Sequence, residues 1–337
     1  MMVRDLVTAL GRKSAAPSAR QPASVDAYWT YLQARRDWNR RTPESLLEAV
    51  RLFGRAADID PTFALAFAGL ADAESLIGYY RVAPLEPSLA RAEGAARHAL
   101  DLNERLAEAH AALGQVHAVR WEWAEADREY QRAIALNPNY ATVRHWYSNY
   151  LSIIGADDAA IEQARVAVAI DPLSPIVRSG ALANALLRAG RSDEALVEYD
   201  RALELDPGFG NARLGRASAY ARKRMRTEAL REVAIVAGLR PAWNAAALAI
   251  SAGFDAAPDA RRVLQTLEQN SDMSAVAIAR VYAVLGEEEN AVRHLQRAFA
   301  QRDPDLAPII REPWFERVRG DRRVSDMVKS LALPMRH

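Results

Sequence analysis

The chain has 337 residues, of which 50% are hydrophobic, and its 44 basic and 43 acidic residues leave a formal net charge of +1. This near balance gives no broad attraction for nucleic acid or for an anionic membrane. Because the chain contains no Cys, disulfides and thiolate zinc sites are excluded. The many Ala, Leu, Arg and Glu residues favour helices.

Residues 1–24 are predicted to form a flexible tail. Their apolar run, Leu6 to Leu10, is interrupted by Thr8 and followed by Gly-Arg-Lys, so it lacks the core of a signal peptide. No window in the chain approaches the ~18–20 apolar residues that a membrane helix needs. We therefore expect a soluble, cytoplasmic protein with no membrane partner.

A repeated pattern organises residues 25–303. The clearest copies are EAVRLFGRAADIDP (48–61), EADREYQRAIALNP (125–138), AAIEQARVAVAIDP (159–172), EALVEYDRALELDP (194–207) and EALREVAIVAGLRP (228–241). Successive copies end 34, 35 and 34 residues apart from residue 138 onward. A second apolar segment precedes each copy, and both segments have apolar residues at i, i+3, i+4 and i+7, which is the helical period. Each unit therefore reads as helix, turn, helix and a closing proline.

Helix pairs of this length and pattern resemble the tetratricopeptide repeat. The matching small residues of the first helices are Gly114, Ser148, Ala217 and Ala279. The matching alanines of the second helices are Ala49, Ala92, Ala126, Ala160, Ala195, Ala229 and Ala291, and the closing prolines are Pro61, Pro138, Pro172, Pro207 and Pro241. The resemblance implies an all-α fold, a right-handed superhelix (α-solenoid) of about seven to eight TPR-like helix pairs.

Three departures from the pattern carry further predictions. About nine extra residues between Ile77 and Arg91 predict a longer surface loop. Residues of about 243–270 predict a shortened, degenerate helix pair. Residues 304–337 lose the pattern and predict short helices that cap the C-terminal end of the solenoid.

The overall arrangement also resembles the repeat half of certain bacterial regulators, in which a winged-helix, kinase or cyclase-like domain precedes the repeats. Here only a tail of some two dozen residues precedes the first repeat. Under this alternative, the chain is the sensory module of a split or truncated transcriptional regulator or kinase.

No motif for catalysis, cofactor binding or metal binding is present. The sequence lacks GxxxxGK[ST], GxGxxG, GxSxG and HExxH, which mark phosphate-binding loops, nucleophile elbows and zinc sites. His110 and His117 are seven residues apart, about 10 Å along a helix, which is too far for one ion. We interpret these two residues, and the aromatic group Trp146, Tyr147 and Tyr150, as structural, and we predict no enzyme, no cofactor and no metal.

The repeat family uses its first helices to line a concave groove, and this resemblance implies the binding residues. They are Glu108, Gln115, Thr142, His145, Asn149, Ser152, Asn211 and Ser218, with Ser179 and Ala183 placed less firmly in the 35-residue unit. The basic clamp that grips acidic chaperone tails in this family is absent at the matching places, so we predict no binding of such tails. The predicted function is a non-catalytic scaffold that binds a peptide or protein partner in this groove.

Overall fold

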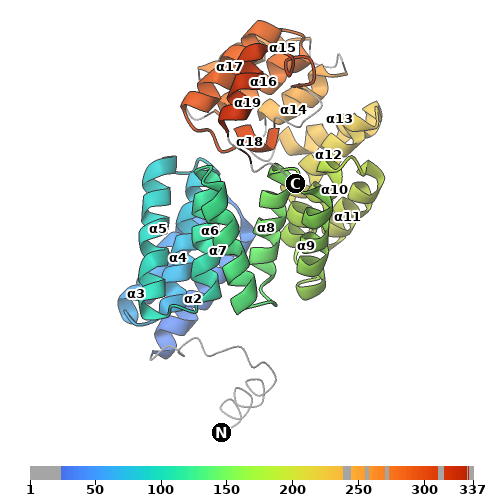
Figure 1. The fold of residues 1–337 in the computed structure, drawn as a ribbon. Coiled ribbons are helices and arrows are strands. Elements are labelled where there is room, and N and C mark those ends of the chain that lie inside the picture. Colours follow the sequence, from blue (N-terminus) through green and yellow to red (C-terminus); the bar gives the residue numbers. More distant parts are fainter. Residues whose placement is uncertain are drawn as a thin grey trace. The chain divides into compact units, whose positions relative to one another are not determined.

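A computed structural model describes residues 24–237, 244–254, 258–269, 273–309, 315–331 and 333. Every regular element in these ranges is a helix (Figure 1), which confirms the all-α prediction. None of the described helices is both long and apolar enough to cross a bilayer. The predicted tail, apart from Ser24, and the closing residue Pro241 lie outside the described residues.

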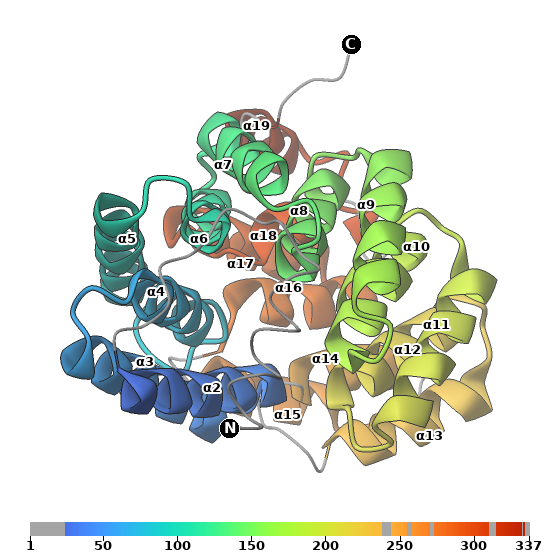
Figure 2. The ribbon, with the colours of Figure 1, turned by 90° about the horizontal axis from the view of Figure 1, so that it is seen from below.

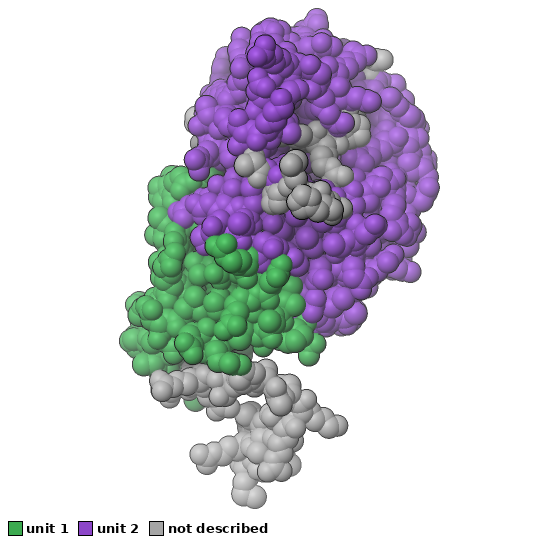
Figure 3. All heavy atoms as spheres, viewed as in Figure 1, with its two compact units in different colours: residues 1–116, 128–139 green, residues 117–127, 140–337 purple. Residues whose placement is uncertain are grey.

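The chain divides into two compact units (Figure 3). Unit 1 comprises residues 1–116 and 128–139, and unit 2 comprises residues 117–127 and 140–337. Two helices, α6 (Ala107–Val119) and α7 (Trp123–Leu136), are therefore shared between the units.

Unit 1 is built from antiparallel helix pairs. Besides its parts of α6 and α7, it contains α2 (Val25–Arg40), α3 (Pro43–Ile59), α4 (Ala64–Tyr79) and α5 (Leu85–Leu102). The helices α2 and α3 pack on each other, as do α4 and α5, and α3 packs on α4. Figure 2 shows the second helices α3 and α5 on one side of the unit and the first helices α4 and α6 on the other.

Unit 2 continues the same plan. Its helices are α8 (Ala141–Ile153), α9 (Asp157–Ile170), the π-helix η1 (Val177–Ala183), α10 (Asn184–Arg188), α11 (Ser192–Leu205), α12 (Gly210–Arg222), α13 (Arg226–Ala237), α14 (Asn244–Ala252), α15 (Ala260–Glu268), α16 (Ala275–Val284), α17 (Glu288–Ala300), α18 (Leu306–Ile309) and α19 (Arg322–Ser330). Each first helix packs on its own second helix, and the pairs stack in chain order.

The residues that define the repeat have the predicted packing roles. All seven second-helix alanines are fully buried, as are Ser148, Ala217 and Ala279 of the first helices. A side chain larger than a methyl group at these places would hold the paired backbones apart. The prolines at 61, 138, 172 and 207 each stand two residues beyond the last residue of a second helix, where the helix cannot continue through them.

The predicted long loop between Ile77 and Arg91 is mostly helix. Most of the extra residues lengthen the helices: α4 has 16 residues and α5 has 18, whereas α6 and α7 have 13 and 14. The connection itself, residues 80–84, is only slightly longer than residues 120–122 between α6 and α7. Pro84 is the N-cap of α5 and Pro87 lies in its first turn. Proline is tolerated there because the first amides of a helix have no intrahelical partner.

The 35-residue unit absorbs its extra residue in a π-helix. In η1, the backbone bonds reach five residues back, so one more residue fits into the turn without ending the helix. Residues before η1 lie 34 residues after their equivalents in the preceding repeat. Residues after η1 lie 35 residues after theirs. The repeat register is thereby restored before α11 begins.

The C-terminal helices of unit 2 pack back onto its first residues. The indole nitrogen of Trp123 donates a buried hydrogen bond of 2.7 Å to the carbonyl of Leu331, just after α19. Trp121, in the turn before α7, stacks on Phe299 of α17 with ring centroids 5.9 Å apart, and α18 contacts α8. These contacts cover the turn that the two tryptophans flank.

We predict that Gly114→Ala destabilises the protein by about 1–3 kcal/mol, the range for overpacking a filled core. A Cβ on Gly114 of α6 would lie 2.7 Å from Cδ1 of Tyr130. The Tyr130 ring is fully buried and its hydroxyl is hydrogen-bonded, so it has little room to shift. Urea unfolding followed by circular dichroism measures the change.

Gly94→Ala in α5 of the same unit is the matched control. Gly94 is exposed, and a Cβ there meets nothing within 4 Å, so alanine should stabilise the helix by roughly 0.5–1 kcal/mol. Equal effects of the two substitutions would show that close helix approach at Gly114 is not required.

Candidate interaction surface on the first helices

In unit 1, the predicted binding residues Glu108 and Gln115 lie on α6 and are half-buried. The hydroxyl of Tyr130 donates a 3.0 Å hydrogen bond to Oε1 of Gln115, which ties this amide to α7. Among the described residues, no side chain donates a hydrogen bond to Glu108. Burial raises the pKa of the Glu108 carboxyl, partly opposed by its own backbone amide and by the positive charge of Arg35.

In unit 2, four predicted residues share one face of α8 but differ in exposure. Thr142 and Asn149 are half-buried, whereas His145 and Ser152 are only 6% and 2% exposed. The imidazole of His145 fills the space beside Gly180 of η1, where a Cβ would lie 3.0 Å from Nε2. The structure therefore assigns His145 and Ser152 to packing and leaves Thr142 and Asn149 accessible.

The remaining predicted residues, Asn211 and Ser218, lie on α12 and are half-buried. The hydroxyl of Ser218 donates to the carbonyl of Leu214 in its own helix, at 3.0 Å. Its oxygen can still accept a hydrogen bond from a ligand.

Asn184, which the sequence analysis did not single out, occupies the place expected for Ala183. The hydroxyl of Tyr199 donates to Oδ1 of Asn184 at 2.5 Å, and this contact repeats the one between Tyr130 and Gln115 in unit 1. Because η1 absorbs the extra residue just before it, Asn184 is the true equivalent of Gln115. Ala183 is fully buried, and Ser179 is buried with its hydroxyl donating to the carbonyl of Pro175.

Gln115 in unit 1 and Asn149, Asn184 and Ser218 in unit 2 thus occupy equivalent positions of their own repeats, and we call this set of positions the polar column. Its members in unit 2 come from α8, α10 and α12. Asn149 accepts a long hydrogen bond of 3.4 Å from Arg188 of the next first helix. Each of these four side chains carries a hydrogen-bonding group and each is partly accessible.

A second set of repeated contacts joins four of the first helices, α6, α8, η1 and α12, to their second helices. We call it the cross-helix ladder. In unit 1, Nδ1 of His110 lies 2.6 Å from Oε2 of Glu129. In unit 2 the equivalent pairs are Arg144–Gln163 at 2.6 Å, Arg178–Glu198 at 2.7 Å and Arg213–Glu232 at 3.2 Å.

Three of these four nitrogen-bearing side chains also contact a backbone carbonyl at the end of the preceding repeat. His110 Nε2 lies 3.2 Å from the carbonyl of Glu104, Arg178 donates to Pro172 at 3.1 Å, and Arg213 donates to Pro207 at 2.7 Å. A proline cannot continue the helix, so its carbonyl needs a partner other than a helical amide. The signal that could have found the ladder is the recurrence of Arg at positions 144, 178 and 213.

The ladder compensates buried charge. Glu232 is only 4% exposed, and Arg213 and Arg216 both pair with it, at 3.2 and 2.5 Å. A buried carboxylate left without such partners would destabilise the fold strongly. These ion pairs therefore hold helices α12 and α13 together rather than presenting charge to a ligand.

The aromatic group near residue 147 is held by structural hydrogen bonds. The hydroxyl of Tyr147 donates to Asp127 at 2.9 Å, and that of Tyr150 donates to the carbonyl of Trp123 at 3.1 Å. Burial raises the pKa of Tyr150 well above its usual value. The Tyr150 phenol therefore stays protonated at neutral pH.

Tyr282, Glu268 and His294 form a hydrogen-bonded cluster in the C-terminal part of unit 2. Glu268 accepts from the Tyr282 hydroxyl at 2.9 Å and lies 2.8 Å from Nε2 of His294. Burial raises the pKa of Tyr282 to about 12 and lowers the pKa of His294. At neutral pH both groups are uncharged and stacked on each other, with ring centroids 5.4 Å apart.

His110 and His117 belong to separate pairs, since Nδ1 of His117 lies 2.5 Å from Glu122. Within the described ranges, no group of three or more His, Asp or Glu residues is placed to hold a metal ion. The basic residues near position 224 are largely engaged as well: Lys223 pairs with Asp193, Arg222 donates to the carbonyl of Leu187, and Arg226 donates to that of Phe254.

Comparison with known sequences places these helices among characterised repeats. The tetratricopeptide repeat profile matches residues 107–140 and 180–209. The transcriptional regulator HilA of Salmonella typhimurium is 22% identical over 149 residues, which are 44% of this chain and 27% of that protein. A small glutamine-rich tetratricopeptide repeat-containing protein of Mycosarcoma maydis is 36% identical over 86 residues, 26% of this chain and 24% of that protein. The chain thus spans about a quarter of the length of these curated relatives.

Solved structures with the same fold have little sequence in common with this chain. A human IFIT1 dimer with PPP-AAAA has 16% identity and a TM-score of 0.55, over 90% of this chain and 72% of that one. A tetratricopeptide repeat protein from Parabacteroides merdae has 14% identity and a TM-score of 0.51, over 78% of this chain and 98% of that one. These likenesses concern the fold alone.

We predict that Glu108→Gln stabilises the protein at neutral pH. Burial raises the folded-state pKa of Glu108 above its unfolded value, so ionising this carboxyl costs folding free energy. That cost is fully present above the folded pKa and disappears as the pH falls below the unfolded value, about 4.3. Unfolding free energies measured from pH 4 to pH 8 should therefore show a gain that shrinks toward acid.

Glu194→Gln is the control, because the hydrogen bond from Arg191 lowers the pKa of this exposed carboxyl. This substitution should give no gain at neutral pH. A Glu108→Gln variant whose stability matches the wild type at every pH would show that burial does not raise the pKa of the Glu108 carboxyl.

Proposed function

We propose that this chain, a member of the tetratricopeptide-repeat family, is a non-catalytic scaffold that binds a peptide or protein segment along its first helices. The observation that carries the proposal is the polar column in unit 2. Asn149 and Asn184 present partly accessible amides from successive first helices. An amide offers both donor and acceptor groups, which are what an extended peptide backbone needs.

A second row of positions supports the same surface. Thr142 of α8 and Asn211 of α12 occupy equivalent positions two repeats apart, and both are half-buried polar residues. The neighbouring Val143 and Ala212 are fully buried, so a partner at these places meets the polar groups of Thr142 and Asn211. Such groups favour a polypeptide backbone over a bulky apolar ligand.

The proposal of a non-catalytic role is supported by the hydrogen bonds that His and Tyr side chains make to other groups within the protein. The imidazoles of His110, His117 and His294 each contact a carboxylate, and Tyr147 and Tyr150 donate to fixed acceptors. These contacts are of the structural kind that joins one helix or turn to another.

The test uses a segment selected from a random peptide library displayed on phage and panned against the full chain. Binding of the synthetic peptide is then measured by calorimetry for the wild type and for Thr142→Ala/Asn149→Ala. Loss of two hydrogen bonds of about 0.5–1.5 kcal/mol each predicts a dissociation constant about 5- to 150-fold higher.

Asn139→Ala is the matched control, because this amide is exposed in the turn before α8 and is not one of the predicted binding residues. It should leave affinity unchanged. Equal affinity of the double variant and the wild type would contradict the proposed surface. A peptide ending in EEVD should not bind, since the polar column contains no basic side chain.

A further inference from the structure

Helix α2 of unit 1 has an exposed apolar stripe. Val25, Trp29 and Leu32 are 71%, 61% and 37% exposed, and their spacing of four and three residues places them on one line along the helix. The opposite face, with Ala27, Ala34 and Trp38, is buried where α2 packs on α3 and α4. A large exposed Trp in an apolar row is typical of an interaction surface.

The spacing of this row is that of a coiled-coil seam. Positions 25, 29, 32 and 36 follow the alternating four- and three-residue steps that bring two helices together. The first three places are apolar and the fourth is Arg36. The stripe is therefore shaped to receive another helix, with a charge at one end of the seam.

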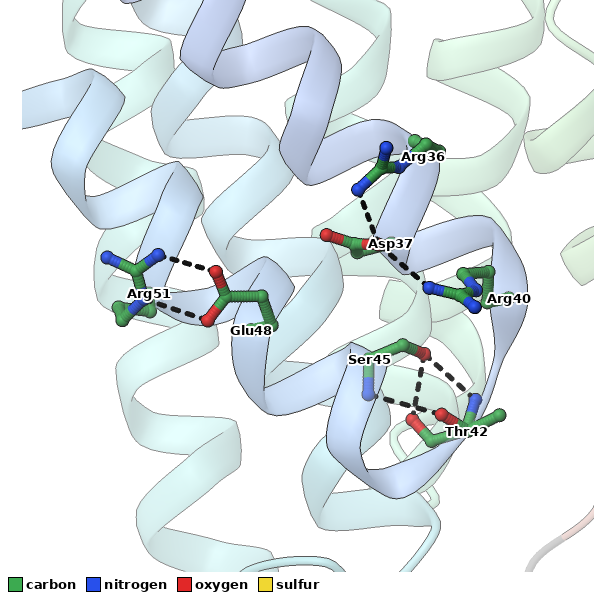
Figure 4. Close-up of polar contacts among 7 residues, drawn as sticks. All are labelled: Arg36, Asp37, Arg40, Thr42, Ser45, Glu48 and Arg51. Carbon is green, nitrogen blue, oxygen red and sulfur yellow. Dashed lines mark hydrogen bonds and ion pairs between the residues drawn. The ribbon is translucent and has the colours of Figure 1, made fainter.

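The charges beside the stripe differ between its two ends. Asp26 is exposed at the N-terminal end of α2, and Arg36 and Arg40 are exposed at the C-terminal end. Figure 4 shows Arg36 and Arg40 on either side of Asp37, at 3.4 and 3.6 Å. The Arg36 side chain is 72% exposed, and a pair so exposed contributes little stability, so its guanidinium is available to a partner.

We propose that a second copy of this chain docks on the stripe, with the two α2 helices antiparallel. A two-fold axis between residues 30 and 31 places Trp29 of each copy against Leu32 of the other. The same axis sets Arg36 of each copy opposite Val25 of the other, one position from Asp26, so the guanidinium and the carboxylate lie side by side. A parallel arrangement would instead bring like charges together, so the charge pattern selects the antiparallel pair.

The area that this contact buries is small, so the dimer is expected to be weak. Trp and Tyr side chains bury about 150–250 Å² each when covered, and Tyr28, 44% exposed, flanks the stripe. A few such side chains fall short of the ~800 Å² per partner of a standard stable interface. The expected dimer is therefore one with a micromolar dissociation constant.

Sedimentation velocity of the full chain tests this proposal, over concentrations from about 1 to about 200 µM, which span micromolar association. The wild type should shift from monomer to dimer across this range. Trp29→Glu should weaken association at least about tenfold, because a central Trp is where binding energy concentrates. Leu173→Glu, at a 75% exposed position in unit 2, is the matched control and should associate like the wild type.

A charge exchange separates the antiparallel contact from general stickiness. Arg36→Asp places two carboxylates opposite each other at both ends and should weaken the dimer several-fold. Asp26→Arg/Arg36→Asp restores opposite charges and should restore association to within about threefold of the wild type. Far-UV circular dichroism confirms that each variant is folded.

Three results would overturn the proposal. One is a wild type that stays monomeric at every concentration, which would mean that another occupant covers the stripe, either residues 1–23 or a different protein. Another is a Trp29→Glu variant that associates like the wild type. The third is a double variant that associates no better than Arg36→Asp alone.

Discussion

The close approach of paired helices at small side chains is the constraint on which the rest of this structure depends. Ala126, Ala160 and Ala195 are fully buried, and a full tyrosine ring fits against α6 only because residue 114 is Gly. Since the backbones are this close, little room remains for polar groups between the helices. Apart from small buried hydroxyls such as those of Ser148 and Ser179, most of the recurring polar groups described above belong to the ladder or to the polar column.

The ladder and the π-helix explain how repeats of unequal length keep one register. Arg178 reaches Glu198 across 20 residues, whereas Arg144 reaches Gln163 across 19. The added residue lies in η1, between Arg178 and Asn184, so the contacts on both sides of it keep the geometry of their neighbours. Because Asn184 follows η1, the same shift brings its amide to the position of Gln115 in its own unit.

Much of the fold could be predicted from the sequence because the residues that define the repeat are those that pack the helices together. Alanines, closing prolines and apolar spacing depend on local geometry and recur in many copies. The residues of the candidate site were harder to predict from the sequence. The burial of His145 depends on Gly180 of another helix, and the place of Asn184 depends on where one extra residue is absorbed. Helix α5, which replaces most of the expected loop after Ile77, has Pro84 as its N-cap, and proline there is compatible with both a loop and a helix start. Only side-chain contacts across helices reveal the ladder.

The central claim is that a bound segment lies on the first helices. Hydrogen–deuterium exchange of the full chain, with and without a saturating selected peptide, tests it most directly. The account predicts slower exchange in α8, α10 and α12 on binding, with α9, α11 and α13 unchanged. Protection confined to α9, α11 and α13 would contradict the account and move the binding surface to the second helices.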